Sequence, residues 1–134
     1  GEAHVADAGL SDRIAYVRGD ALETDWPGGQ DAILMSYLFS GVPDHAHERL
    51  VARTLETLAP GGRLLVHDFI VDADGTGPRN TALWQLQHAA FTPDARALSE
   101  DWLMKRMRAA GFEELSAGPL VPGMTKLVTG RRPA

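Results

Sequence analysis

The segment LAPGGRLLVHDFIVDADGTGP, residues 58–78, contains the strand around which the rest of the chain is organised. Pro60-Gly61-Gly62 stops a preceding helix and turns the chain, and the hydrophobic segment RLLVHDFIV, 63–71, is expected to be a buried strand. The strand delivers two titratable side chains, His67 and Asp68, to a polar loop. The segment therefore predicts a buried strand with potential chemistry at its carboxyl end.

The segments on either side predict alternating strands and helices. Four short apolar segments are expected to be strands: 14–19 (IAYVRG), 31–39 (DAILMSYLF) and two segments around the turn PLVPGM that form an antiparallel hairpin. Helices are expected over 2–8 with a stop at Gly9, 44–58, 80–91, and from an N-cap at Ser99 to Gly111-Phe112. Alternation of this kind predicts an α/β fold with a mostly parallel sheet, in which ligands bind at the carboxyl ends of the strands.

Composition excludes several classes of function. The 134 residues amount to one domain at most, and the net charge of −5 without a basic stripe argues against nucleic acid as a partner. The lack of cysteine excludes disulfides, thiolate-zinc sites and cysteine nucleophiles. No apolar run approaches the length of about 18 residues that a membrane-spanning helix needs, and no signal peptide is recognisable. We expect a soluble cytoplasmic protein.

Five motifs in this order resemble the class I S-adenosylmethionine-dependent methyltransferases, and most closely their small-molecule O-methyltransferase family. They are RIAYVRGDALE (13–23), DAILMSYLFSGVPD (31–44), LAPGGRLLVHDF (58–69), MRAAGF (107–112) and TKLVTGR (125–131). The resemblance implies a Rossmann-like methyltransferase sheet, with residues 1–134 as the C-terminal part of a single catalytic domain. It also implies transfer of a methyl group from S-adenosylmethionine, leaving S-adenosylhomocysteine, to oxygen or carbon of an aromatic or 2-oxo acid natural product.

The same resemblance indicates which parts of the family's pattern the chain lacks. The family's glycine loop, its first strands and its helical dimerisation domain would all precede Gly1. Without those strands, the strand expected at 14–19 has no ladder partners. We therefore expect that residues 1–134 do not form a complete sheet alone, and that either preceding residues or a partner chain supply the missing strands. The family resemblance also implies that the full-length protein is a homodimer. The alternative is a truncated or inactive methyltransferase-like module for binding or assembly.

The resemblance also implies a cofactor site at two strand ends. Gly19, Asp20 and Ala21 would lie near the adenine, where the Asp20 carboxylate can accept a hydrogen bond from the exocyclic amine. Met35, Ser36 and Tyr37 would pack the adenine and the methionyl part. The ordinary alternatives are a turn-capping aspartate and a plain strand end.

The catalytic residues depart from the family's pattern. Asp68 matches a carboxylate that orients the family's histidine base, but the base position falls at Ser40, and a second supporting carboxylate falls at Ala97. His67 is the candidate to replace the base, although neighbours in a strand point to opposite faces. A metal role of His67, with His88 as the best second ligand, stays open, as does a histidine that is only hydrogen-bonded at a strand end.

The acceptor site is expected on the helix over 80–91. Trp84, His88 and Phe91 recur at helical spacing on one face, and aromatic side chains there can sandwich a planar substrate. Ser40 and Met124 are expected to reach the same pocket. A stripe at this spacing is also typical of a helix packed on a core.

Overall fold

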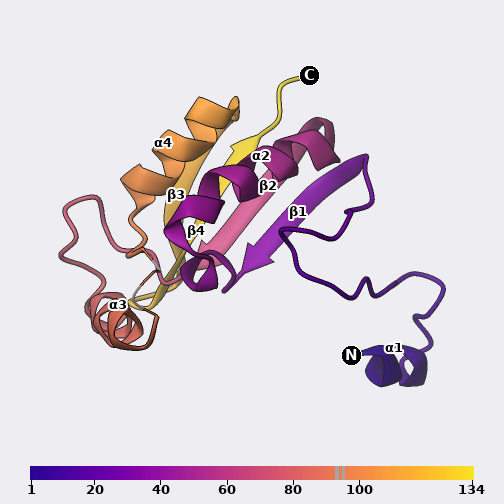
Figure 1. Ribbon diagram of the computed structural model, residues 1–134, viewed down its shortest axis with the longest axis horizontal. Coiled ribbons are helices and arrows are strands. Elements are labelled where there is room, and N and C mark those ends of the chain that lie inside the picture. Colours follow the sequence, from indigo (N-terminus) through magenta and orange to yellow (C-terminus); the bar gives the residue numbers. More distant parts are fainter. Residues whose placement is uncertain (93, 95) are drawn as a thin grey trace.

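The structure is a computed structural model that describes residues 1–92, 94 and 96–134. The described residues form one sheet with two helices over one of its faces and another helix at one end, and the short N-terminal helix lies apart from the sheet (Figure 1). The elements in chain order are α1 (Glu2–Asp7), β1 (Gln30–Ser36), the 3-10 turns η1 (Phe39–Gly41) and η2 (Asp44–Ala46), α2 (His47–Thr57), β2 (Leu58–Asp68), α3 (Arg79–Phe91), α4 (Glu100–Ala110), β3 (Glu113–Val121) and β4 (Thr125–Arg131).

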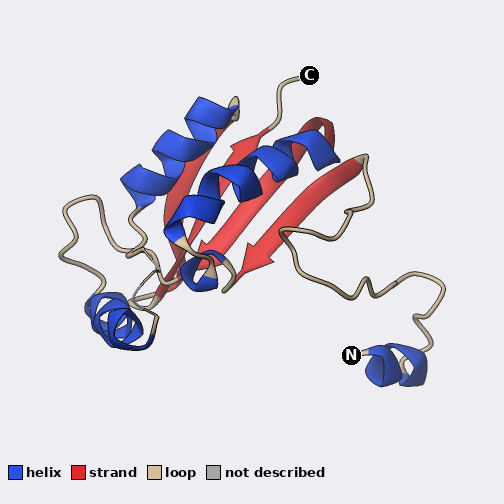
Figure 2. Cartoon of the chain, viewed as in Figure 1, coloured by secondary structure: helices blue, strands red, loops and turns tan. Residues whose placement is uncertain are grey.

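The strand order is β1-β2-β4-β3, which makes the sheet mixed. β1 and β2 are parallel, whereas β4 is antiparallel to both of its neighbours, β2 and β3. The expected α/β class and the antiparallel C-terminal pair are confirmed. The expectation that most neighbouring strands are parallel is wrong. The second strand of the hairpin, β4, lies next to β2, so that two of the three pairs of neighbouring strands are antiparallel (Figure 2).

The strand expected at 14–19 is absent. These residues are irregular and lie away from the sheet, in the segment that leads back to α1 (Figure 1). Ile14 and Val17 keep 43% and 64% of their surface exposed. An apolar pattern favours a strand, but a strand forms only where another strand satisfies its backbone groups, and among the described residues no such partner faces this segment.

Two strand boundaries also differ from expectation. β1 stops at Ser36 because Tyr37 adopts a left-handed conformation, with φ of 53°. β2 begins at Leu58 and contains Pro60-Gly61-Gly62, with an irregularity in its register against β1. A side chain at position 62 would place its Cβ 2.9 Å from the carbonyl oxygens of Ala59 and Gln30, so glycine permits the close approach of the two strands.

The core lies between one face of the sheet and helices α2 and α4 (Figure 2). Leu64 and Val66 point from β2 into it and are fully buried, whereas Leu34 on the opposite face is 64% exposed. α4 has the expected ends, since the Ser99 side chain accepts a hydrogen bond from the Trp102 amide and Gly111 is left-handed. In the part of the chain that the structure describes, no helix has the length and apolarity needed to cross a membrane.

Candidate active site

His67 lies on the open face of the sheet and joins the ends of three strands. Its Nδ1 is 2.9 Å from Ser36 Oγ at the end of β1, and its Nε2 is 2.9 Å from Thr125 Oγ1 at the start of β4. Both ring nitrogens are therefore occupied by hydroxyl groups, each of which can donate or accept. This arrangement fixes the position of the ring and leaves neither nitrogen free.

Asp68 points to the opposite face and is fully buried, and its hydrogen bonds among the described residues do not involve the His67 ring. Its Oδ2 accepts a hydrogen bond of 3.0 Å from the Ser40 amide, and its Oδ1 accepts one of 2.8 Å from the Phe69 amide. A carboxylate that receives two backbone donors in a dry interior is a strong anchor. Asp68 therefore holds the backbone of η1 in place.

Ser40 is held from its other side by α3. His88 Nε2 lies 2.6 Å from the Ser40 carbonyl oxygen, so the backbone of Ser40 is hydrogen-bonded through both its amide and its carbonyl. The two contacts connect the end of β2, the turn after β1 and the last turn of α3. The residue at the family's base position is thus contacted by a histidine from another element.

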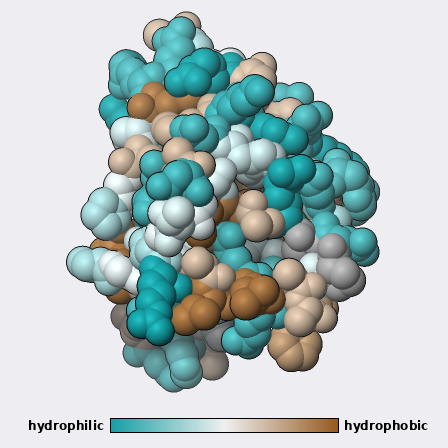
Figure 3. Space-filling view, turned by 90° about the vertical axis from the view of Figure 1, so that its left-hand side faces the viewer, coloured by the Kyte–Doolittle hydropathy of each residue, from teal (hydrophilic) through white to brown (hydrophobic). Residues whose placement is uncertain are grey.

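A small pocket lies between these elements and holds about 30 Å³ of free space. It is lined by three of the predicted acceptor residues, Ser40, Trp84 and His88, and by Ala97. Phe91 and Met124 lie outside the lining and are 78% and 40% exposed. Leu83, Leu86 and Phe91 give α3 an apolar outer surface, and apolar side chains gather in the lower half of the view that faces this side (Figure 3).

Five aromatic rings form a continuous row from the open sheet face to this pocket. The ring centroids are 4.7 Å apart for His67 and Tyr37, 5.4 Å for Tyr37 and Phe69, 4.4 Å for Phe69 and Trp84, and 4.6 Å for Trp84 and His88. The last two pairs are stacked. Phe69, which connects the two halves of the row, was not among the predicted site residues. Its position directly after Asp68 was the available signal.

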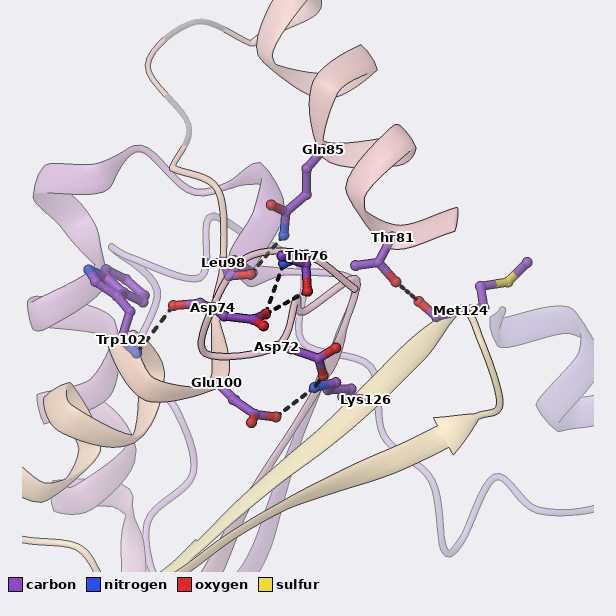
Figure 4. Close-up of polar contacts among 11 residues, drawn as sticks. Asp72, Asp74, Thr76, Thr81, Gln85, Leu98, Glu100, Trp102, Met124 and Lys126 are labelled. Atoms are coloured by element: carbon purple, nitrogen blue, oxygen red, sulfur yellow. Dashed lines mark hydrogen bonds and ion pairs between the residues drawn. The ribbon is translucent and has the colours of Figure 1, made fainter. Parts of the chain in front are cut away.

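Polar contacts fix α3 and the loop before it (Figure 4). Gln85 Nε2 donates to the Phe69 carbonyl at 2.8 Å and to the Leu98 carbonyl at 2.7 Å. Thr81 Oγ1 donates to the Met124 carbonyl, so Met124 contributes its backbone to this region. The helix that carries Trp84 and His88 is therefore attached both to the end of β2 and to the hairpin.

Lys126 joins β4 to this loop and to the start of α4 (Figure 4). Its side chain is 8% exposed, and its ammonium donates to Asp72 and, at 2.6 Å, to Glu100 at the start of α4. Burial alone would lower the pKa of Lys126, but the hydrogen bonds to the two carboxylates outweigh it and raise the pKa above its usual 10.5. Sequence analysis did not identify this cluster, because its members lie far apart in the chain.

Gly19, Asp20 and Ala21 line a hollow of about 170 Å³ together with Trp26. Asp20 Oδ1 accepts a hydrogen bond of 2.8 Å from the Leu22 amide, as a turn aspartate does. Its second oxygen has no hydrogen-bond partner among the described residues. A Cβ at Gly19 would lie 1.8 Å from Thr24 Oγ1, so the turn requires glycine. An acceptor oxygen, an aromatic ring and a hollow suit the adenine end of a nucleoside.

Met35, Ser36 and Tyr37 divide between the two sides of the sheet. The Met35 side chain is 4% exposed and belongs to the core, whereas Ser36 and Tyr37 are exposed at the strand end. Any contact of Met35 with a ligand would therefore be made by its backbone. Over residues 1–92, 94 and 96–134, no group of three or more His, Asp or Glu side chains is placed to hold a metal ion.

Comparison with known proteins gives the family. Residues 2–113 match the family described as O-methyltransferase domain. The chain belongs to this family. The family is one of S-adenosylmethionine-dependent small-molecule methyltransferases, as the sequence motifs indicated, although not every relative of the chain is named for that reaction.

The relatives are named for different reactions. The chain is 29% identical over 130 residues to a 3-hydroxy-5-methyl-1-naphthoate 3-O-methyltransferase of Streptomyces sahachiroi, covering 94% of this chain and 36% of that protein. It is 36% identical over 108 residues to the aclacinomycin 10-hydroxylase RdmB of Streptomyces purpurascens, covering 80% and 28%. A family 2 O-methyltransferase of Planctomyces limnophilus, solved in complex with apigenin, matches with a TM-score of 0.77 at 28% identity, covering 96% and 37%. The chain thus spans about a third of the length of these relatives.

Proposed function

We propose that this chain is the acceptor-binding part of a methyltransferase that transfers the methyl group of S-adenosylmethionine to a hydroxyl group of a small aromatic molecule. The observation that carries this proposal is the pocket at the carboxyl ends of β1 and β2, which is lined by Ser40, Trp84 and His88. Ligands of open α/β sheets bind at this edge. The naphthoate methyltransferase and the protein solved with apigenin both handle hydroxylated aromatic rings, which supports this class of acceptor.

The residues around Gly19 fit the adenine end of the cofactor. The second oxygen of Asp20 would accept from the exocyclic amine, and the Trp26 ring would border the base. Ser36 and Tyr37, exposed at the end of β1, would line the path toward the acceptor. When bound, the cofactor supplies an electrophilic methyl group; the residues of this chain orient it and exclude water.

His67 and Asp68 take positioning roles in this proposal. His67 fixes the ends of β1, β2 and β4 through two hydroxyl groups, and Asp68 fixes the backbone of Ser40. Precise placement of the acceptor next to the methyl donor contributes a large part of such a rate enhancement, because a displaced acceptor loses the near-attack geometry. The contacts of His67 favour this role over that of a base.

Calorimetric titration of S-adenosylhomocysteine into the protein tests the proposal. In a protein that carries the family's glycine loop together with this chain, we expect one site per chain, and we expect Asp20→Asn to weaken binding about tenfold, because the amide can present a donor where the carboxylate presented an acceptor. Asp12→Asn, on the same exposed segment, is the matched control and should bind as the unchanged protein does. Absence of binding by a protein whose circular dichroism shows a folded state would favour the binding or assembly module instead.

A further inference from the structure

We propose that His88 is the general base of this site and that its Nδ1 takes the proton from the acceptor hydroxyl. The inference rests on the proposed function and adds to it the group that activates the acceptor. The family's base position holds Ser40, and the family's second carboxylate position holds Ala97; His88 lines the same pocket as both. His88, on α3, therefore brings a histidine ring to the pocket, whereas Ser40 at the family's base position does not.

The hydrogen bond to Ser40 determines which nitrogen of His88 can act. The Ser40 carbonyl can only accept, so the Nε2 atom that lies 2.6 Å from it carries a proton. In the neutral ring Nδ1 then has its lone pair, and it has no hydrogen-bond partner among the described residues. His67, in contrast, has a hydroxyl group on each nitrogen and does not line the pocket.

The surroundings hold this ring in place. Its face is stacked on Trp84, with centroids 4.6 Å apart, and its Nε2 is bonded to a backbone that the buried Asp68 anchors from the other side. A base fixed by packing and by a hydrogen bond at its second nitrogen follows the same logic as other catalytic histidines. Asp68 and His88 are thus connected through hydrogen bonds to the backbone of Ser40, in place of a direct hydrogen bond between a carboxylate and a histidine.

The size of the pocket adds a limit on the acceptor. Free space of about 30 Å³ admits a hydroxyl group or one or two water molecules but not an aromatic ring. The ring of the acceptor would thus lie at the mouth of the pocket, with its hydroxyl group inserted. In the step itself the O–H bond breaks, the proton forms an N–H bond at Nδ1, and the electron pair stays on the oxygen, which becomes the nucleophile for the methyl group.

Two measurements test the inference without the cofactor. Long-range proton–nitrogen NMR of the neutral His88 ring should show the proton on Nε2, and a proton on Nδ1 would overturn the assignment. Addition of 4-nitrophenol at neutral pH, followed by the visible absorbance of its phenolate, should show extra phenolate with the unchanged protein. Absence of this increase would also overturn it.

The variant His88→Gln separates the base from its structural role. The glutamine amide can still donate to the Ser40 carbonyl but cannot take a proton, so we expect the extra phenolate to disappear and turnover to fall about 10²–10⁴-fold with unchanged affinity for S-adenosylhomocysteine. His45→Gln, an exposed histidine outside the pocket, is the control and should behave as the unchanged protein. Full turnover by His88→Gln refutes the inference and leaves the proposed function standing. Phenolate formation without binding of S-adenosylhomocysteine supports the base and refutes methyl transfer.

Discussion

Replacement of Asp68 by asparagine should weaken the fold strongly, although it changes neither size nor shape. The fully buried carboxylate receives the amides of Ser40 and Phe69 at 3.0 and 2.8 Å. Asparagine has one acceptor oxygen, so one of the two amides would face an NH2 group. Loss of a hydrogen bond to a charged group costs about 1.5–3 kcal/mol, and a buried donor without a partner costs about 1–3 kcal/mol. These effects overlap, and we expect the free energy of unfolding to fall by about 3 kcal/mol.

Urea unfolding, followed by tryptophan fluorescence, measures this loss. With a slope of about 2 kcal/mol per molar urea for a chain of this size, the midpoint should fall by about 1.5 M. Asp12→Asn, on an exposed segment, should stay within about 0.5 kcal/mol of the unchanged protein. If the midpoint of Asp68→Asn falls by less than about 0.5 M, the carboxylate is not the anchor of η1, and the positioning role of Asp68 is wrong.

Three further changes follow from the packing. Lys126→Met should lower the free energy of unfolding by about 2–3 kcal/mol, because it leaves Asp72 and Glu100 without their shared cation. Because its folded pKa is raised above 10.5, the stabilisation from Lys126 should be complete below that pH and be lost as the pH rises through the folded pKa; a stability curve that is flat across this range would contradict the pairing. Gly62→Ala should cost about 1–3 kcal/mol in urea unfolding, since its Cβ meets backbone oxygens at 2.9 Å that cannot move away. Leu34→Thr should change stability by less than about 0.5 kcal/mol, because this side chain is 64% exposed, and a larger loss would show that the open face is covered in solution.

The local pattern of apolar residues was sufficient to predict those strands and helices whose apolar side chains are buried against other parts of this chain. The apolar residues before His67 follow the strand period, and the buried apolar face of α2, with Leu50 and Val51, follows the helix period. Both patterns arise because the strand and the helix pack against each other in one core. The segment 14–19 has the same kind of pattern but no strand beside it, and it is irregular. Periodicity reports what a segment can bury, whereas the presence of a partner decides whether it becomes a strand.

The site was predictable where it depends on the strand period and not where it depends on distant contacts. Alternation along a strand correctly separates His67 from Asp68. The bond between His88 and Ser40 joins residues 48 positions apart, and no spacing rule in one sequence links a helix to a turn at that distance. The same holds for the attachment of Gln85 to the backbone on both sides of α3.

The position of β4 has a consequence for the order in which the chain can fold. β4 supplies the second edge of β2 and is the partner of β3, yet it is made of residues 125–131. Until a ribosome has released that segment, β2 has only β1 beside it, and β3 has no partner in the sheet. Until residues 125–131 have been synthesised, the second edge of the apolar strand β2 therefore stays exposed. Nascent chains with such exposed edges bind chaperones or aggregate.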